Sequence, residues 1–195
     1  MTKNVILTDI DGVVLNWEAS FNEWMAQKKY VLVEPDAYNV NQRFNISREK
    51  SKELVRIFNE SAQIGFLSPL RDSLPYMTKI HHEFGITFHC ITSLSLDKCA
   101  QKLRIQNLEN WFGSNVFSEY LFADTGQDKN HILKNYIHTN YIWVEDKPVN
   151  AEDGLAYGLR PYLMAHNYNL DYKHPEIKRV SSWREIYNDL KQSGF

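Results

Sequence analysis

The sequence contains little cysteine and no long hydrophobic run. Cys90 and Cys99 are its two cysteines among 195 residues, so a disulfide framework is excluded, and we interpret both as free thiols of a reducing compartment. No apolar run approaches the roughly 18 residues of a membrane span. The first residues also lack the apolar core and cleavage site of a signal peptide. We therefore expect a soluble, cytoplasmic protein that does not act at a membrane.

A strong excess of charge of one sign is missing as well. The 22 Lys and Arg residues nearly balance 24 Asp and Glu residues, which leaves a formal net charge of -2. A partner such as a nucleic-acid polymer usually requires a clear basic excess, so none is predicted. Aromatic residues, in contrast, make up 13% of the chain. The length favours one domain with room for a small insertion.

Short apolar runs alternate with helical patterns through most of the chain. Strands are predicted at 5–8, 86–92, 115–122, 141–144 and 160–165, and helices at 18–29, 47–62, 73–84, 96–112, 128–136, 149–157 and 182–191. This alternation is typical of a parallel sheet. We therefore predict an α/β, Rossmann-like fold with helices on both faces of the sheet.

The connection between the first two predicted strands is unusually long. One helix suffices for a normal crossover, whereas this connection holds three helical stretches. We predict a helical insertion at 17–70 and an α/β core formed by 1–16 and 71–195. The insertion would lie over the carboxyl ends of the strands, where open α/β sheets bind ligands. Its aromatic residues either form a small core or supply one or two stacking faces for a nucleobase: Trp17, Phe21, Trp24, Tyr30, Tyr38 and Phe44.

Acidic residues follow two of the predicted strands. Asp9 and Asp11 come after the first strand and precede Gly12, which would allow a turn, and Glu145-Asp146 ends the fourth. On an extended chain, Asp9 and Asp11 would point the same way and repel each other. The four carboxylates form a hard-oxygen set of the kind that binds Mg²⁺.

Groups suited to a phosphate lie at the other strand ends. Thr92 and Ser93 end the second strand, and the backbone N–H groups of Ser93 and Leu94 lie where we expect the next helix to begin. A helix N-terminus favours anions. Lys129, at the start of the helix after the third strand, adds a positive charge. Together with the acids, these residues predict a site for a metal ion and a phosphate.

In order and spacing, these stretches resemble the four motifs of the haloacid dehalogenase (HAD) superfamily of phosphohydrolases. VILTDIDGV resembles motif I, FHCITS motif II, Lys129 in GQDKNHILKNY motif III, and IWVEDKPVNAEDG motif IV. A narrower likeness, to the 5'(3')-deoxyribonucleotidase branch, lies in GFLSPLRDSLPYMTKIHHEFGITFHCITSLS and in the tail PYLMAHNYNLDYKHPEIKRVSSWREI.

The resemblance implies a mechanism and a substrate class. Asp9 would be the nucleophile, and Asp11 the general acid and then the general base. Mg²⁺ would be held by Asp9, the backbone carbonyl of Asp11, Asp146, and Glu145 directly or through water. Thr92, Ser93 and Lys129 would bind the phosphate of a small phosphomonoester. A nucleoside monophosphate is the expected substrate, preferably a deoxyribonucleotide, and a homodimer is left open.

Two positions depart from the motif IV pattern. Glu145 stands where many members have Asp, and Asn150 stands where many have a further Asp. Either Asp153 compensates for Asn150, or Asn150 acts behind the metal ligands.

Three other functions remain as alternatives. One is a HAD-type phosphatase of small sugar phosphates. The second is a phosphoacceptor signalling module, for which Asp124 after the third strand would be the acceptor. The third is a binding module without catalysis.

Overall fold

The computed structural model describes residues 4–194 and contains one parallel six-stranded sheet. Its order is β3-β2-β1-β4-β5-β6, and the strands are β1 (Val5–Thr8), β2 (Thr87–Ser93), β3 (Phe117–Ala123), β4 (Ile142–Glu145), β5 (Arg160–Met164) and β6 (Lys178–Val180). The α/β, Rossmann-like prediction is confirmed. The chain reverses its direction of travel across the sheet between β1 and β4, which is where such folds bind ligands.

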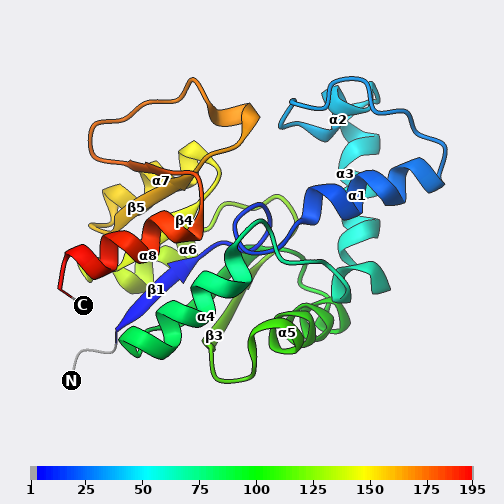
Figure 1. Ribbon diagram of the computed structural model, residues 1–195. Coiled ribbons are helices and arrows are strands. Elements are labelled where there is room, and N and C mark those ends of the chain that lie inside the picture. Colours follow the sequence, from blue (N-terminus) through cyan, green and yellow to red (C-terminus); the bar gives the residue numbers. More distant parts are fainter. Residues whose placement is uncertain (1–3, 195) are drawn as a thin grey trace.

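Helices cover both faces of the sheet (Figure 1). They are α1 (Trp17–Gln27), α2 (Val40–Arg43), α3 (Arg48–Asn59), α4 (Ser73–Phe84), α5 (Lys98–Phe112), α6 (Asn130–Leu133), α7 (Pro148–Ala156) and α8 (Trp183–Gln192), with 3-10 turns η1 (Ala62–Gly65), η2 (Lys134–Tyr136) and η3 (Asn167–Asn169). Among residues 4–194, none of these helices is long and apolar enough to cross a membrane.

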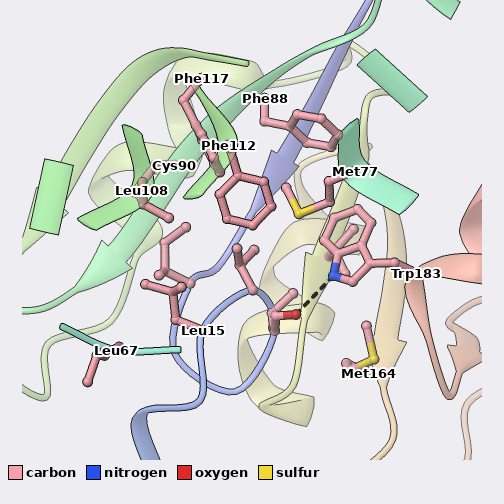
Figure 2. Packing of buried hydrophobic residues seen from close by; sticks show 14 of the residues in the cluster. Leu15, Leu67, Met77, Phe88, Cys90, Leu108, Phe112, Phe117, Met164 and Trp183 are labelled. Carbon is pink, nitrogen blue, oxygen red and sulfur yellow. Dashed lines mark hydrogen bonds between the residues drawn. The ribbon is translucent and has the colours of Figure 1, made fainter. Parts of the chain in front are cut away.

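Alternate residues of each strand pack on opposite faces of the sheet, as the pleat requires. Ile6 joins the large core beneath α4, α5 and α8, whereas Leu7 joins a smaller core beneath α6. In the large core, the Trp183 indole Nε1 donates to the Val13 carbonyl at 2.9 Å (Figure 2). This bond ties the C-terminal helix α8 to the turn that follows β1, and so fixes the turn that carries the acids.

Helices α1, α2 and α3 gather beyond the carboxyl end of β1, apart from the helices that flank the sheet (Figure 1). We call residues 17–70, which contain them, the inserted segment. Its rings pack around Phe21, which stacks on Trp17 at 4.5 Å between centroids and meets Phe58 edge-on at 5.3 Å. These rings belong to the same apolar cluster as the large core. We propose the inserted segment as the cap, with the boundaries expected from the sequence.

A few elements differ from the sequence predictions. The short edge strand β6 was not predicted, because its three residues are Lys, Arg and Val. The helix expected from residue 96 begins at Lys98, since the Asp97 carboxylate accepts the Ala100 N–H at 2.8 Å and acts as its N-cap. Both cysteines are free, as predicted, with Cys90 buried and Cys99 exposed.

Candidate active site

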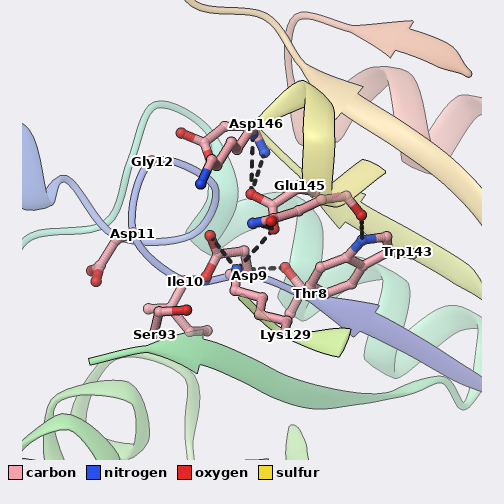
Figure 3. Close-up of polar contacts among 12 residues, drawn as sticks. Thr8, Asp9, Ile10, Asp11, Gly12, Ser93, Lys129, Trp143, Glu145 and Asp146 are labelled. Atoms are coloured by element: carbon pink, nitrogen blue, oxygen red, sulfur yellow. Dashed lines mark hydrogen bonds and ion pairs between the residues drawn. The ribbon is translucent and has the colours of Figure 1, made fainter. Parts of the chain in front are cut away.

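A buried ion network lies where β1 and β4 end side by side (Figure 3). The Lys129 Nζ is 2.7 Å from the Asp9 Oδ2 and 2.8 Å from the Glu145 Oε2. The other oxygen of Asp9, Oδ1, accepts the Ile10 N–H at 2.7 Å. The rule that strand ends meet at one edge places Asp9 beside Glu145, and the start of α6 brings Lys129 between them.

The pKa values in this network follow from burial and charge. Burial raises the pKa of Asp9 to about 8; the Glu145 carboxylate adds to the rise and the Lys129 ammonium opposes it. Burial also raises the pKa of Glu145, but Lys129 and hydrogen bonds outweigh it and bring the value to about 2. Burial lowers the pKa of Lys129, yet both carboxylates keep it above its ordinary range. Lys129 therefore stays charged.

Glu145 is saturated with hydrogen bonds. Its Oε1 accepts the N–H groups of Asp146 and Lys147 at 3.0 and 3.1 Å, and its Oε2 accepts the Asn150 amide at 3.1 Å as well as Lys129. Asn150 therefore lies behind Glu145, which is the position that one of the two alternatives gives it. Because both of its oxygens already accept hydrogen bonds, Glu145 is better suited to positioning Lys129 than to binding a metal ion directly.

Oxygen atoms of Asp9, Glu145 and Asp146 lie within 4.8 Å of one another. Burial and the Glu145 charge raise the pKa of Asp146 well above its ordinary value. A cation beside Asp9 and Asp146 would favour the ionised form of both. Buried carboxylate oxygens at this spacing fit Mg²⁺, which prefers hard oxygen ligands and keeps several waters.

Asp11 lines the same pocket but faces away from this cluster (Figure 3). Its Oδ1 accepts a hydrogen bond from Nη1 of the fully buried Arg104 at 2.7 Å. The expectation that Asp9 and Asp11 point the same way is wrong, because β1 ends at Thr8 and the chain then turns. Gly12 has a φ of +80°, and a Cβ there would lie 2.6 Å from the Asp146 Oδ2.

Thr92 and Ser93 occupy the end of β2, as predicted. Thr92 is buried, and the Ser93 hydroxyl donates to the Gln127 carbonyl at 2.8 Å. The next helix does not begin at Ser93 and Leu94, so its N-terminus does not supply the expected anion site. The helix begins four residues after Leu94, and Asp97 caps its first turn.

One pocket of about 820 Å³ contains the whole predicted set. All seven predicted site residues line it: Asp9, Asp11, Thr92, Ser93, Lys129, Glu145 and Asp146. Such a volume lies within the roughly 300–1,000 Å³ typical of small-molecule sites. The inserted segment contributes Trp17 and Tyr38 to the lining, while Phe21, Trp24 and Phe44 are buried in the ring cluster.

Sequence reasoning missed Tyr168 and Arg104, whose side chains contact the carboxylates of predicted acids. The Tyr168 hydroxyl, from the loop after β5, donates to the Asp146 Oδ2, and Arg104 binds Asp11. A signal for Arg104 was present, because it lies between Ala100 and Leu108 at four-residue spacing on the buried face of α5. Tyr168 follows a predicted strand at the same sheet edge, which was the available clue for it.

Comparisons with known proteins identify the fold. No family model matches the chain. An uncharacterized 32.4 kDa protein of Enterobacteria phage T4, from the Gp30-rIII intergenic region, is 29% identical over 199 residues, covering 96% of this chain and 70% of the phage protein.

Solved structures of HAD-superfamily hydrolases match nearly the whole chain. A D,D-heptose 1,7-bisphosphate phosphatase from B. bronchiseptica, complexed with magnesium and phosphate, has a TM-score of 0.62 and 13% identity, covering 98% of this chain and 99% of its own. A HAD-like hydrolase from Streptococcus pneumoniae has a TM-score of 0.64 and 11% identity, with coverage of 96% and 98%. An L-2-haloacid dehalogenase has a TM-score of 0.61 and 11% identity, with coverage of 96% and 99%.

At these identities the structures establish the fold alone. The chain has the HAD-type α/β fold, and its structural neighbours are hydrolases that include both a phosphatase and a dehalogenase. Because one fold serves several chemistries, the activity has to be argued from the side chains of the site.

Proposed function

We propose that the protein is a Mg²⁺-dependent phosphomonoesterase of nucleoside monophosphates, preferably deoxyribonucleotides. The observation that carries the proposal is the placement of Asp9. Its carboxylate lies on the floor of a large pocket, fixed by the Lys129 ammonium and the Ile10 N–H, beside the acidic cluster with Asp146. A fixed carboxylate beside a cation site is suited to attack a phosphorus atom.

In the proposed reaction, a carboxylate oxygen of Asp9 attacks phosphorus and the bond from phosphorus to the leaving alcohol oxygen breaks. Asp11 gives its proton to that oxygen, then takes a proton from the water that hydrolyses the aspartyl-phosphate. Thr92, Ser93 and Lys129 hold the phosphoryl oxygens. Asp9, Asp146 and the Asp11 backbone carbonyl would hold Mg²⁺, which would supply positive charge next to the phosphoryl group.

Chemistry favours phosphate ester hydrolysis over dehalogenation. A halide leaves as a stable anion without a proton, whereas an alcohol leaves readily only when its oxygen is protonated. Asp11 provides a second carboxylic group in the pocket for that proton. The acids near Asp9 would also repel an anionic substrate unless a cation offset them. The proton source at Asp11 is the feature that supports the phosphatase over the dehalogenase.

The nucleotide preference is supported by the aromatic lining. Trp17 and Tyr38 contribute to the pocket from the inserted segment, and aromatic rings can stack on a base. The Trp17 indole is held by a hydrogen bond from Nε1 to the Asn59 Oδ1 at 2.9 Å and by its stack on Phe21. The alternative, a sugar phosphatase, is supported by the likeness to the heptose bisphosphate phosphatase.

The test is phosphate release across a substrate panel, with Mg²⁺ or with a chelator. We expect release from dUMP and dTMP in the presence of Mg²⁺ and none with the chelator. Release from sugar phosphates at equal or higher kcat/KM would reject the nucleotide preference while leaving the phosphatase. Absence of release from every phosphomonoester would favour a binding module.

The phosphoacceptor alternative has weak support. A receiver domain is expected to carry its acceptor on a middle strand, but Asp124 follows β3, which is an edge strand of the sheet. Its carboxylate is also engaged by Arg56 at 3.1 Å.

A further inference from the structure

Helix α3 presents a cationic face to the pocket. Its pocket-lining residues recur at spacings of three and four, which places them on one side of a helix: Arg48, Ser51, Lys52, Val55, Arg56 and Asn59. Three of them carry a positive charge. The acids predicted for catalysis come from the strand ends. We call Asp9, Lys129, Glu145 and Asp146 the floor of the pocket, and the pocket-lining face of α3 its wall, so the floor is acidic and the wall is basic.

Several cations of the lining are already committed to protein partners. Arg56 pairs with Asp124 at 3.1 Å and with Glu60 at 3.4 Å. Arg43 pairs with Glu18 at 3.0 Å. Arg71 donates to the carbonyls of Ser181 and Ala165. Each of these three arginines therefore already donates hydrogen bonds to groups of the protein itself.

Arg48 and Lys52 are different. Both are exposed on the pocket side of α3, and over residues 4–194 neither has a salt bridge. In the proposed reaction, the reacting phosphate is held by Thr92, Ser93 and Lys129. Arg48 and Lys52 are therefore not needed for it. They offer positive charge to a second part of a ligand.

We infer that the pocket takes a small phosphomonoester that carries a second anionic group, and that Arg48 and Lys52 hold this group. The inference rests on the proposed phosphatase, with the reacting phosphate at Asp9. Two neighbouring cations on one helix face suit a phosphate or carboxylate, which can accept hydrogen bonds from both.

A small ligand fits the surroundings better than a polymer. The inserted segment closes over the core on one side of the pocket, because the Asn167 amide donates to the Asp36 carboxylate at 2.6 Å. Tyr38 also meets Tyr168 edge-on, with 5.0 Å between ring centroids. The net charge of -2 does not favour a polyanion either.

The experiment compares two matched pairs of substrates with Mg²⁺. One pair is thymidine 3',5'-bisphosphate and thymidine 5'-monophosphate, and the other is fructose 1,6-bisphosphate and fructose 6-phosphate. We expect kcat/KM for the bisphosphate to exceed that for the monophosphate about tenfold in at least one pair, and high salt to reduce the ratio. A 5'-phosphorylated oligothymidylate is included, and preference for it would reject the small-ligand inference.

The double substitution R48M/K52M should lower that ratio about fivefold or more, mainly through KM. The matched control is Lys50→Met, which removes a lysine of the same helix that pairs with Glu53 at 3.0 Å and does not line the pocket. An unchanged ratio in R48M/K52M, or an equal fall in Lys50→Met, would overturn the inference.

Equilibrium binding separates this inference from the proposed function. Affinities of the four small compounds are measured by calorimetry on the Asp9→Asn protein and on Asp9→Asn with R48M/K52M. Tighter binding of the bisphosphates, lost in the second protein, supports the inference even when no compound is hydrolysed by the wild type. Equal binding of bisphosphates and monophosphates in both proteins rejects it.

Discussion

The floor and the α3 wall of one pocket use charge in opposite ways. On the floor, Lys129 is buried between Asp9 and Glu145, and each group has a fixed partner. On the wall, Arg48 and Lys52 are exposed and form no salt bridge within residues 4–194. The side chains proposed to do the chemistry are thus held in position by the folded protein. The side chains proposed to select the substrate take up their positions when the ligand binds.

Among changes to the floor and the wall, the largest effect on activity is expected at Asp9. Asp9→Asn should lower phosphatase kcat at least about 10³-fold, because an amide does not attack phosphorus. Circular dichroism and single-turnover phosphate release would measure the fold and the activity. The control is Asp124→Asn, which removes the acid that a receiver domain would need. Full activity in Asp9→Asn, or loss of activity confined to Asp124→Asn, would reject Asp9 as nucleophile.

Removing the Lys129 ammonium from the floor should lower the stability of the protein as well as its activity. Lys129→Met leaves two buried carboxylates without their partner, which is expected to cost about 3–5 kcal/mol of unfolding free energy. Urea unfolding measures this loss. The control Lys134→Met alters an exposed lysine five residues further on and should change stability by less than about 0.5 kcal/mol. Similar losses in both variants would contradict the network described for the floor.

The acidic residues of the floor could be predicted from the sequence, because each of them follows a strand that an apolar run marks. Apolar runs mark the strands, and parallel strands bring their carboxyl ends to one edge. That rule alone places Asp9, Thr92 and Glu145 in one site. The geometry of Asp11 could not be predicted in this way, since the extended-chain argument holds only up to Thr8, where β1 ends.

The contacts around the floor depend on tertiary placement. The spacing of Arg104 with Ala100 and Leu108 marks the buried face of α5, but an arginine in an amphipathic helix is usually exposed, so its burial against Asp11 did not follow from that spacing alone. Tyr168 reaches Asp146 from a loop that follows β5, so its role required the strand order as well as the strand positions. The pocket face of α3 likewise depends on how the inserted segment folds over the sheet.

Tyr168 connects the acidic floor to the inserted segment. Its hydroxyl donates to Asp146, and its ring meets Tyr38. Tyr168→Phe keeps the ring and removes the hydrogen bond that orients Asp146. Loss of such an outer partner should raise the Mg²⁺ concentration for half-maximal activity about tenfold.

The matched control for this variant is Tyr172→Phe. The Tyr172 hydroxyl donates to the Glu152 Oε1 at 2.7 Å, away from the acidic cluster. We expect the Mg²⁺ dependence of Tyr172→Phe to follow that of the wild type. If Tyr168→Phe does the same, the hydroxyl does not position a metal ligand.

The smallest expected effect lies where the wall meets the core, at the ion pair between Arg56 of α3 and Asp124 after β3. The Arg56 guanidinium, together with the Thr125 N–H, holds the pKa of the Asp124 carboxyl below its ordinary value. A carboxyl with a lowered folded-state pKa stabilises the fold above its unfolded pKa, and this contribution is lost as the pH falls through the folded value. Arg56→Gln should therefore cost at most about 1 kcal/mol near neutral pH, because the pair is partly exposed and screened.

The difference between Arg56→Gln and the wild type should shrink as the pH falls below the ordinary aspartate range near about 4. Urea unfolding at neutral and acidic pH measures both points. Lys50→Gln serves as the control, since its partner Glu53 lies on the same helix and joins no second element. A cost for Arg56→Gln that stays constant over the whole pH range would mean that its packing holds α3 to β3. A cost that disappears in acid would mean that the ion pair with Asp124 holds α3 to β3. Arg56 would then differ from Arg48 and Lys52, which form no salt bridge within residues 4–194.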